Sequence, residues 1–279
     1  MYLNKNPLHY NKMTLCILDF ETTGLVPTSD EIIECAMKIY DKEYVYSTLV
    51  KPDHVGRAPP GYHGAYIFPK ITELTGITNR MIYKQGITQK LLAQQIYEFL
   101  ETHKVTHIVA HNGDQFDFIL LKLLLLRFGY NFTKYQYIDT MYLFKTILRK
   151  TKTRCTSMSQ ENLCSMFQVV QKDAHRALGD VVALESLWYH IVTLYSLRTK
   201  QYLNYNYDVL KKLGSPPIEY SDRIVYYISH LLEMYHEKKP VLTIRNVNGR
   251  TRSLLYNFLD KQNIKFHHET GSNYVTFRQ

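Results

Sequence analysis

Two carboxylates lie two residues apart at the end of an apolar run, in the segment TLCILDFETTG. If this run is a strand, its period of two points Asp19 and Glu21 to the same face, roughly 7 Å apart along the chain. Oxygen ligands at the carboxyl end of a strand, beside a turn at Gly24, suit a hard cation such as Mg²⁺ or Mn²⁺. Taken alone, two solvated acids at an exposed strand end are the more ordinary explanation.

A third carboxylate, Asp117, opens the most apolar helix expected in the chain, in VAHNGDQFDFILLKLLLLRFG. The leucines after it recur at helical spacing, so we expect a largely buried helix that ends at Gly129. An acid in the first turn favours the helix dipole. That effect does not explain the polar turn at His111 and Asn112, which comes just before the helix.

The segment AHRALGDVVALESLW supplies the last two candidates. Apolar residues from Ala177 to Trp188 recur at helical spacing, and Asp180 lies on the flank of this stripe. His175 comes five residues before Asp180, on the loop expected to lead into the helix. A free imidazole has a pKa of about 6.5, which suits proton transfer at neutral pH.

These residues have one shared chemical interpretation. Four carboxylates, from Asp19, Glu21, Asp117 and Asp180, would hold two metal ions about 4 Å apart, a spacing that suits in-line attack on a phosphodiester. His175 would take the proton of the attacking water. The ordered set is far more specific than any of its parts, because a purely structural explanation would need several independent coincidences.

The motifs DFETTG, AHNGDQFDFILL and HRALGD resemble the three exonuclease motifs of the DEDDh (DnaQ-like) 3′–5′ exonucleases, over roughly residues 13–200. The second motif has three residues, Gly113, Asp114 and Gln115, between its Asn and its Phe-Asp pair. This longer form resembles the three-prime repair exonucleases. The resemblance implies a ribonuclease H-like α/β fold, with a mixed central sheet flanked by helices. It also implies two Mg²⁺ or Mn²⁺ ions per active site, the four carboxylates as metal ligands and His175 as general base.

The resemblance further implies contacts to the substrate. The 3′-terminal nucleotide would be held by Thr22, Thr23, Gly24, Leu25 and Ile77. Leu25 would act as a wedge against the base. His111 and Asn112 would shape their turn and approach the scissile phosphate.

A basic segment, KTILRKTKTR at residues 145–154, separates the second motif from the third and contains no acid. Its position resembles that of a basic DNA-binding loop in some three-prime repair exonucleases. We therefore expect phosphate contacts, weakening as salt rises, from Lys145, Arg149, Lys150, Lys152 and Arg154. A solvated basic loop is the ordinary alternative.

The composition is that of a globular protein, with 45% hydrophobic and 21% charged residues, and the net charge of +9 favours a polyanionic partner. At 279 residues the chain is long enough for a large and a small domain. We expect an exonuclease domain at residues 1–205 and a small α+β domain at residues 206–279. The second is basic, with eleven Lys and Arg against seven acids, a net charge of +4.

The C-terminal sequence GRTRSLLYNFLDKQNIKFHHETGSNYVTF weakly resembles a small single-strand-binding domain named for its Arg-xxx-His signature. In this chain the corresponding residues are Arg252 and Tyr256, so the histidine is missing. If this part binds DNA, we expect Arg250, Arg252 and exposed tyrosines to supply charge and stacking. A structural appendage or a partner-docking module explains the segment equally well.

The cysteines form no C-x-x-C pair and no zinc-binding spacing. We expect reduced thiols in an intracellular protein of the cytoplasm or nucleus, with no signal peptide and no membrane segment. The abundance of tyrosine, asparagine, lysine and isoleucine is consistent with an AT-rich, virus-encoded gene.

We expect a metal-dependent 3′–5′ exonuclease that releases nucleoside 5′-monophosphates from single-stranded or frayed DNA 3′ ends. An RNA 3′–5′ exonuclease and a polymerase proofreading subunit stay open as alternatives. A third alternative, an inactive nucleic-acid-binding scaffold, is disfavoured because all four carboxylates and the histidine are present. The resemblance also implies a homodimer as one oligomeric form.

Overall fold

The computed structural model describes residues 13–53, 66–199 and 220–278. The expected domain boundary after residue 205 lies outside the described residues. The strands are β1 Leu15–Thr22, β2 Ile32–Ile39, β3 Val45–Lys51, β4 Ile87–Thr88, β5 His107–Ala110, β6 Gln136–Asp139, β7 Val241–Arg245, β8 His267–Thr270 and β9 Tyr274–Arg278. The helices are α1 Pro69–Thr75, α2 Asn79–Gln85, α3 Gln89–Thr102, the short 3₁₀ turn η1 Gly113–Gln115, α4 Asp117–Arg127, α5 Thr140–Lys150, α6 Gln160–Phe167, α7 Ala177–Thr199, α9 Tyr220–Glu237 and α10 Gly249–Lys261.

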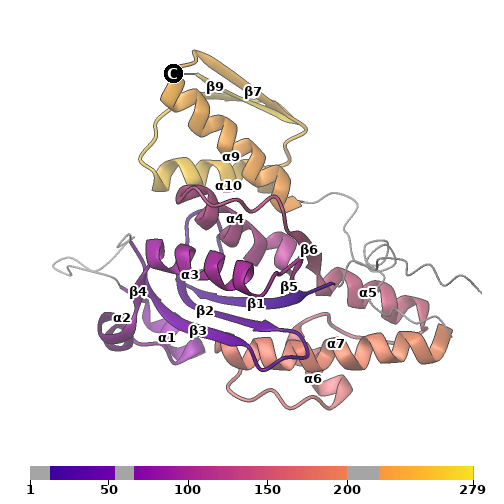
Figure 1. Cartoon of the computed structure of the whole chain (residues 1–279). Coiled ribbons are helices and arrows are strands. Elements are labelled where there is room, and N and C mark those ends of the chain that lie inside the picture. Colours follow the sequence, from indigo (N-terminus) through magenta and orange to yellow (C-terminus); the bar gives the residue numbers. More distant parts are fainter. Residues whose placement is uncertain (1–12, 54–65, 200–219, 279) are drawn as a thin grey trace, which may run out of the picture.

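A six-stranded mixed sheet in the order β4-β3-β2-β1-β5-β6 forms the centre of the larger part. Strand β1 pairs with β2 in the antiparallel and with β5 in the parallel direction, and β5 pairs with β6 in parallel. Figure 1 shows α3 and α4 over one face of this sheet and α6 and α7 over the other. The expected α/β architecture, a mixed central sheet flanked by helices, is confirmed.

Strand β1 is buried on both faces, and its alternation decides what each side chain meets. Cys16, Leu18 and Phe20 belong to the hydrophobic cluster formed with α3 and α4, whereas Leu15 and Ile17 belong to the cluster formed with α5, α6 and α7. Because successive strand residues alternate in direction, the next odd-numbered residues, the two acids of the first motif, face α7. The hydrophobic pattern of β1 therefore aims its two carboxylates at the helix of the third motif.

Helix α7 is long and apolar enough, by length and composition, to cross a bilayer over Ala177–Tyr195. One such helix is weak evidence for a membrane segment, because core helices of globular proteins pass the same test. Here Val181, Leu184 and Leu187 are fully buried in the cluster that α7 forms with the sheet. We therefore treat α7 as a core helix.

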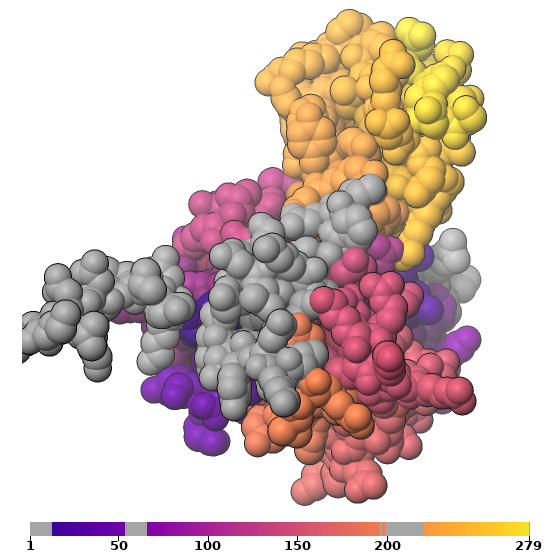
Figure 2. All heavy atoms as spheres, turned by 90° about the vertical axis from the view of Figure 1, so that its right-hand side faces the viewer, coloured from indigo at the N-terminus to yellow at the C-terminus, as the bar shows by residue number. Residues whose placement is uncertain are grey.

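Residues 220–278, called the C-terminal unit from here on, contain a three-stranded antiparallel sheet in the order β7-β9-β8 together with α9 and α10. This is the small α+β architecture expected for the end of the chain. Its hydrophobic cluster also includes Ile119 of α4, with Leu123 packed against it. Figures 1 and 2 show the unit projecting from the rest of the molecule above α4, on the side away from α7. Helix α4 is thus covered by the central sheet on one side and by the C-terminal unit on the other.

Candidate active site

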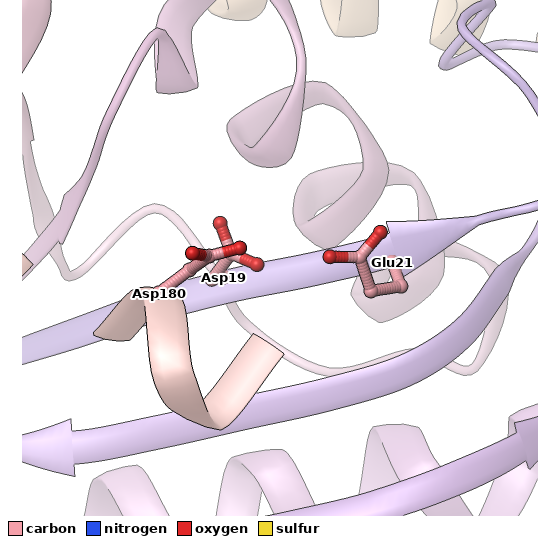
Figure 3. A group of neighbouring side chains, drawn as sticks. All are labelled: Asp19, Glu21 and Asp180. Atoms are coloured by element: carbon pink, nitrogen blue, oxygen red, sulfur yellow. The ribbon is translucent and has the colours of Figure 1, made fainter. Parts of the chain in front are cut away.

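Three of the predicted metal ligands meet in one cluster. Asp19 and Glu21 come from β1 and Asp180 from the first turn of α7, and Figure 3 shows their carboxylates gathered above the strand. One oxygen from each lies within 4.8 Å of the others. A single divalent ion with ligand distances of about 2.0–2.6 Å can bridge oxygens at such separations.

Asp117 lies near this cluster and its charge acts on Asp19, but it is not one of the three carboxylates whose oxygens meet. It is the first residue of α4 and is 4% exposed. Its Oδ1 accepts a hydrogen bond of 3.2 Å from the backbone N–H of Phe20. Since Phe20 lies between Asp19 and Glu21, this bond holds the start of α4 against the middle of the first motif. The buried leucines of α4 fix the helix against the sheet, and the helix in turn holds the carboxylate of Asp117 in place.

The neighbouring carboxylates oppose the ionisation of Asp19 and Glu21. Burial, and then the charges of Asp117 and Asp180, raise the pKa of Asp19 well above its usual value. Burial, and then the charges of Asp180 and Glu34, raise the pKa of Glu21 to about 8. Burial also raises the pKa values of Asp117 and Asp180. Closely spaced, partly buried acids of this kind ionise more readily beside a cation, so the donor set fits a hard divalent metal.

His175 lies in the loop that runs into α7, as expected, and its side chain is exposed. Its φ of 62° places it in the left-handed region. Gly179, in the first turn of α7, allows this loop to pass close by. A Cβ at Gly179 would lie 2.3 Å from the carbonyl oxygen of Lys172 and 2.6 Å from that of Asp173. Only glycine fits there, and it keeps the histidine loop against the turn that carries Asp180.

A buried ion pair that the sequence analysis did not single out fastens the same loop. Glu34 is 3% exposed and pairs with Glu21 in the register of β1 and β2. Its carboxylate accepts hydrogen bonds from Arg176 Nε at 3.0 Å and from the backbone N–H of Ala177 at 3.0 Å. The first residue of α7 and the residue after His175 are thereby fixed to β2. The available signal was a single acid inside the apolar run IIECAM.

The loop after β1 is organised by Asp30, another residue that the sequence analysis missed. Its carboxylate accepts hydrogen bonds from the Thr23 hydroxyl at 3.1 Å and from the backbone N–H of Val26 at 2.7 Å. A Cβ at Gly24 would lie 2.6 Å from Asp30 Oδ2, so a larger residue here would displace the carboxylate that organises the loop. Leu25 is 87% exposed beside it. The loop therefore presents one large apolar side chain on a braced turn.

Two residues expected to hold the terminal nucleotide are placed inside the protein. Thr22 is 7% exposed, and its hydroxyl donates to the carbonyl oxygen of Gly24 at 2.6 Å, so it braces the loop from within. Ile77 is fully buried in a small cluster with Ile33 and Ile82. Contrary to the expectation that it lines the nucleotide pocket, Ile77 has no surface in this structure to offer a ligand.

His111 shapes the turn of the second motif through both ring nitrogens. Its Nε2 donates to the carbonyl oxygen of Met158 at 2.6 Å, and its Nδ1 lies 2.9 Å from the Thr140 hydroxyl. Burial lowers the pKa of His111, which favours the neutral ring. The expected role in shaping the turn agrees with these contacts, but neither nitrogen is left to reach a phosphate.

Asn112 follows in the left-handed region, with φ of 62°. Its backbone N–H donates to Asp139 Oδ1 at 3.1 Å, and the backbone N–H of Asp114 donates to Asp139 Oδ2 at 3.1 Å. Asp139 also caps α5 by accepting from the N–H of Met141. One buried carboxylate thus fixes the turn of the second motif to the start of α5.

Asp114, the middle residue of the longer second motif, reaches the C-terminal unit. Its carboxylate accepts hydrogen bonds from the backbone N–H groups of Tyr220 and Ser221, both at 2.9 Å, and from the Ser221 hydroxyl at 2.8 Å. These donors belong to the first turn of α9. The lengthened motif therefore caps a helix of the C-terminal unit.

The expected basic loop is partly a helix. Lys145, Arg149 and Lys150 lie on α5, because the apolar residues between them pack in one cluster with α7 and the helix extends to residue 150. Lys152 and Arg154 follow it. All five side chains are exposed or half-exposed, and none forms an ion pair with a described residue. The contact between His111 and Met158 fixes the end of this segment beside the second motif.

The comparisons with known proteins agree with this geometry. The family model RNase_T, described as exonuclease, matches residues 16–185, which is more than half of the chain. The chain therefore belongs to this DnaQ-like exonuclease family. The closer resemblance to the three-prime repair exonucleases stays a prediction.

Among curated proteins, the DNA polymerase III PolC-type of Thermotoga petrophila is 34% identical over 175 residues, which are 61% of this chain and 11% of that protein. The corresponding Thermotoga maritima protein is 28% identical over 92% of this chain and 16% of its own length. Exonuclease DPD1, chloroplastic/mitochondrial, of Arabidopsis thaliana is 28% identical over 63% of this chain and 55% of that protein. The chain thus spans only a small part of the PolC-type proteins.

Among solved structures, E. coli exonuclease I in complex with a dT13 oligonucleotide superposes with a TM-score of 0.56 and 19% identity. The match covers 68% of this chain and 43% of that one. At such low identity the likeness concerns the fold, which is the ribonuclease H-like exonuclease fold expected from the motifs.

Proposed function

We propose that this protein is a metal-dependent 3′–5′ exonuclease that hydrolyses phosphodiester bonds at DNA 3′ ends and releases nucleoside 5′-monophosphates. The observation that supports it most is the cluster of Asp19, Glu21 and Asp180, whose oxygens lie within 4.8 Å of one another. Asp117, which accepts a hydrogen bond from the backbone of β1, adds a fourth carboxylate. These carboxylates are a donor set for one or two hard cations, next to the loop that follows β1.

Bound Mg²⁺ or Mn²⁺ ions, two per site, would activate water and offset the negative charge that develops on the phosphate. The protein's part is to hold these ions with four carboxylates and to move one proton. His175 is exposed, lies on a loop fixed by Glu34 and Arg176, and would accept the proton of the attacking water at a ring nitrogen. Leu25 would pack against the terminal base, and Thr23 and Gly24 would hold the nucleotide beneath it.

DNA is the substrate that we favour, since the similar proteins include DNA polymerases III and an exonuclease I bound to a deoxyoligonucleotide. RNA is the second candidate. A protein distinguishes the two through the 2′-hydroxyl of the terminal nucleotide. In this proposal Leu25 and the backbone of the loop after β1 would lie beside that hydroxyl.

The test uses 5′-labelled single-stranded DNA, duplex DNA and RNA with the full chain and Mg²⁺ or Mn²⁺. A ladder of 3′-shortened products from DNA is expected, and it should vanish with EDTA and in Asp19→Asn and Asp117→Asn. Asp260→Asn, an exposed acid of α10, is the matched control and should retain the ladder. If no substrate is shortened by the wild-type protein, or if EDTA leaves the ladder intact, the proposal is wrong.

A further inference from the structure

The C-terminal unit is anchored beside the candidate active site. Tyr220 and Ser221, at the start of α9, donate to the carboxylate of Asp114, three residues before Asp117. Lys122 of α4 is 1% exposed, and its Nζ donates to the Ser221 hydroxyl at 2.9 Å and pairs with Asp222. The first turn of α9 therefore has a fixed position relative to the metal-binding carboxylates.

Two arginines at this anchored end have no acidic partner among the described residues. The guanidinium of Arg223 lies 5.7 Å from the ring centre of Tyr220, and that of Arg250, from the start of α10, lies 5.6 Å from it. Neither forms an ion pair with any described residue, and Arg223 Nε is buried without an acceptor there. Two uncompensated cations held around one ring form a site for an anion.

Two aromatic side chains, one exposed and one half-exposed, continue from Arg223 along α9. Tyr226 and His230 follow it by three and seven residues, which places all three on one face of the helix. Tyr226 is 58% exposed, and its ring centre lies 4.1 Å from that of His230. The far end of α9 differs, because Glu233 pairs there with Lys239. Both halves of α9 carry an exposed tyrosine, Tyr226 and Tyr235. Within α9, the arginine without an acidic partner among the described residues lies in the half nearest the candidate active site.

We propose that Arg223, Arg250 and Tyr226 bind the single-stranded part of the substrate upstream of the scissile bond. Unpaired guanidiniums suit its phosphates, and an exposed aromatic ring suits base stacking. This inference rests on the proposed nuclease function, because the same strand must end at the loop that carries Leu25. It also reassigns the predicted contacts of this part of the chain. Arg252 donates to the carbonyl oxygen of Gly271 at 2.6 Å and braces the β8–β9 turn instead.

Binding is tested with the full chain, a fluorescent oligothymidylate and EDTA over a series of salt concentrations. Arg223→Gln and Arg250→Gln should each reduce the slope of log K against log salt by about 0.7, as expected for one lost phosphate contact on a single strand. Tyr226→Ala should weaken binding several-fold without changing the slope. The controls are Lys238→Gln, an exposed cation just beyond the far end of α9, and Tyr189→Ala, a tyrosine of α7 with 60% exposure. Both controls should bind like the wild-type protein.

Cleavage distinguishes this surface from the active site. On a trinucleotide the three variants should retain the wild-type kcat/KM, whereas on a long oligothymidylate they should lose roughly tenfold. Failure of the wild-type protein to cut either substrate would refute the nuclease function. The salt-dependent binding of the variants would still test whether Arg223, Arg250 and Tyr226 bind the strand. Variants that bind with the wild-type slope, or competition by polyglutamate as strong as that by oligothymidylate, would overturn the proposal. Arg250 is exposed, so its substitution tests the surface without disturbing the fold.

Discussion

The carboxylate of Asp114 accepts a hydrogen bond of 2.9 Å from the backbone N–H of Tyr220, a residue that lies 106 positions further along the chain. Asp114 belongs to the turn of the second motif, and Tyr220 begins α9. Since Asp117 starts α4 just after this turn, the candidate metal site and the C-terminal unit share one structural support. We therefore expect a substitution that disturbs the C-terminal unit to alter the candidate metal site as well, and the reverse.

Replacing Asp114 by alanine removes the acceptor of two backbone N–H groups at the start of α9. We expect the free energy of unfolding to fall by about 1–2 kcal/mol, the usual range for losing a helix cap. Asp114→Asn should lose less, because its amide oxygen can still accept. Denaturant unfolding measures the effect, with Asp260→Ala, an exposed acid of α10, as the neutral control. An unchanged midpoint in Asp114→Ala would show that the contact contributes nothing.

Ending the chain at residue 199 would remove the cover of α4. Ile119 and Lys122 are 0% and 1% exposed, and both would face water in the shortened chain. We expect aggregation or loss of cooperative unfolding, since an uncovered apolar face promotes association. Size-exclusion chromatography and thermal melting provide the measurement. The added change Ile119→Gln should partly restore solubility, and a shortened chain that stays monomeric and melts cooperatively would contradict this expectation.

Glu34→Gln tests whether the ion pair with Arg176 positions the histidine loop. The amide cannot balance the guanidinium, so the loop before α7 should lose its fixed position. We expect kcat to fall roughly tenfold or more with a smaller change in KM, because misplaced catalytic groups chiefly slow the chemical step. Glu185→Gln, which breaks the ion pair of the same helix with Lys38, is the matched control. Equal kcat values for the two variants would argue against a positioning role.

Metal should stabilise the protein more at alkaline than at acidic pH. The pKa of Glu21 is raised to about 8 in the folded protein, so the metal-free fold favours its protonated form. Because this pKa lies above the ordinary value of 4.5, the stability that the protonated group contributes is complete below about pH 4.5 and is lost as the pH rises through about 8. A bound cation would offset the repulsion between the ionised carboxylates and so stabilise their charged forms. The rise in Tm with Mn²⁺ should thus be larger at about pH 8 than at about pH 5.5, and Asp19→Asn should diminish it.

An Mn²⁺ effect of the same size at both pH values would contradict the raised pKa values. The companion measurement is the metal-free melting curve, whose midpoint should fall across the same interval. Glu185→Gln lies away from the carboxylate cluster and should follow the wild-type profile.

The candidate metal site was largely readable from the sequence because each motif is local. Period-two alternation placed Asp19 and Glu21 on one face of β1, and helical spacing placed Asp117 at the start of α4. The motif HRALGD placed Asp180 in the first turn of α7. Alternation of buried residues also indicated the mixed α/β layers, since burial follows the period of each element.

The contacts that hold these parts together were decided by the tertiary structure. Glu34 meets Arg176 across 142 positions, and Asp114 meets Tyr220 across 106. Ile77 is a core residue, and α5 extends into the segment that was expected to form a basic loop. Such pairings depend on strand order and on which helix faces pack together, and neither leaves a local pattern in the chain. The sequence by itself determined which groups can bind metal. The order of the strands and the packing of α4 and α7 decided that these groups meet, and that the C-terminal unit is fixed beside them.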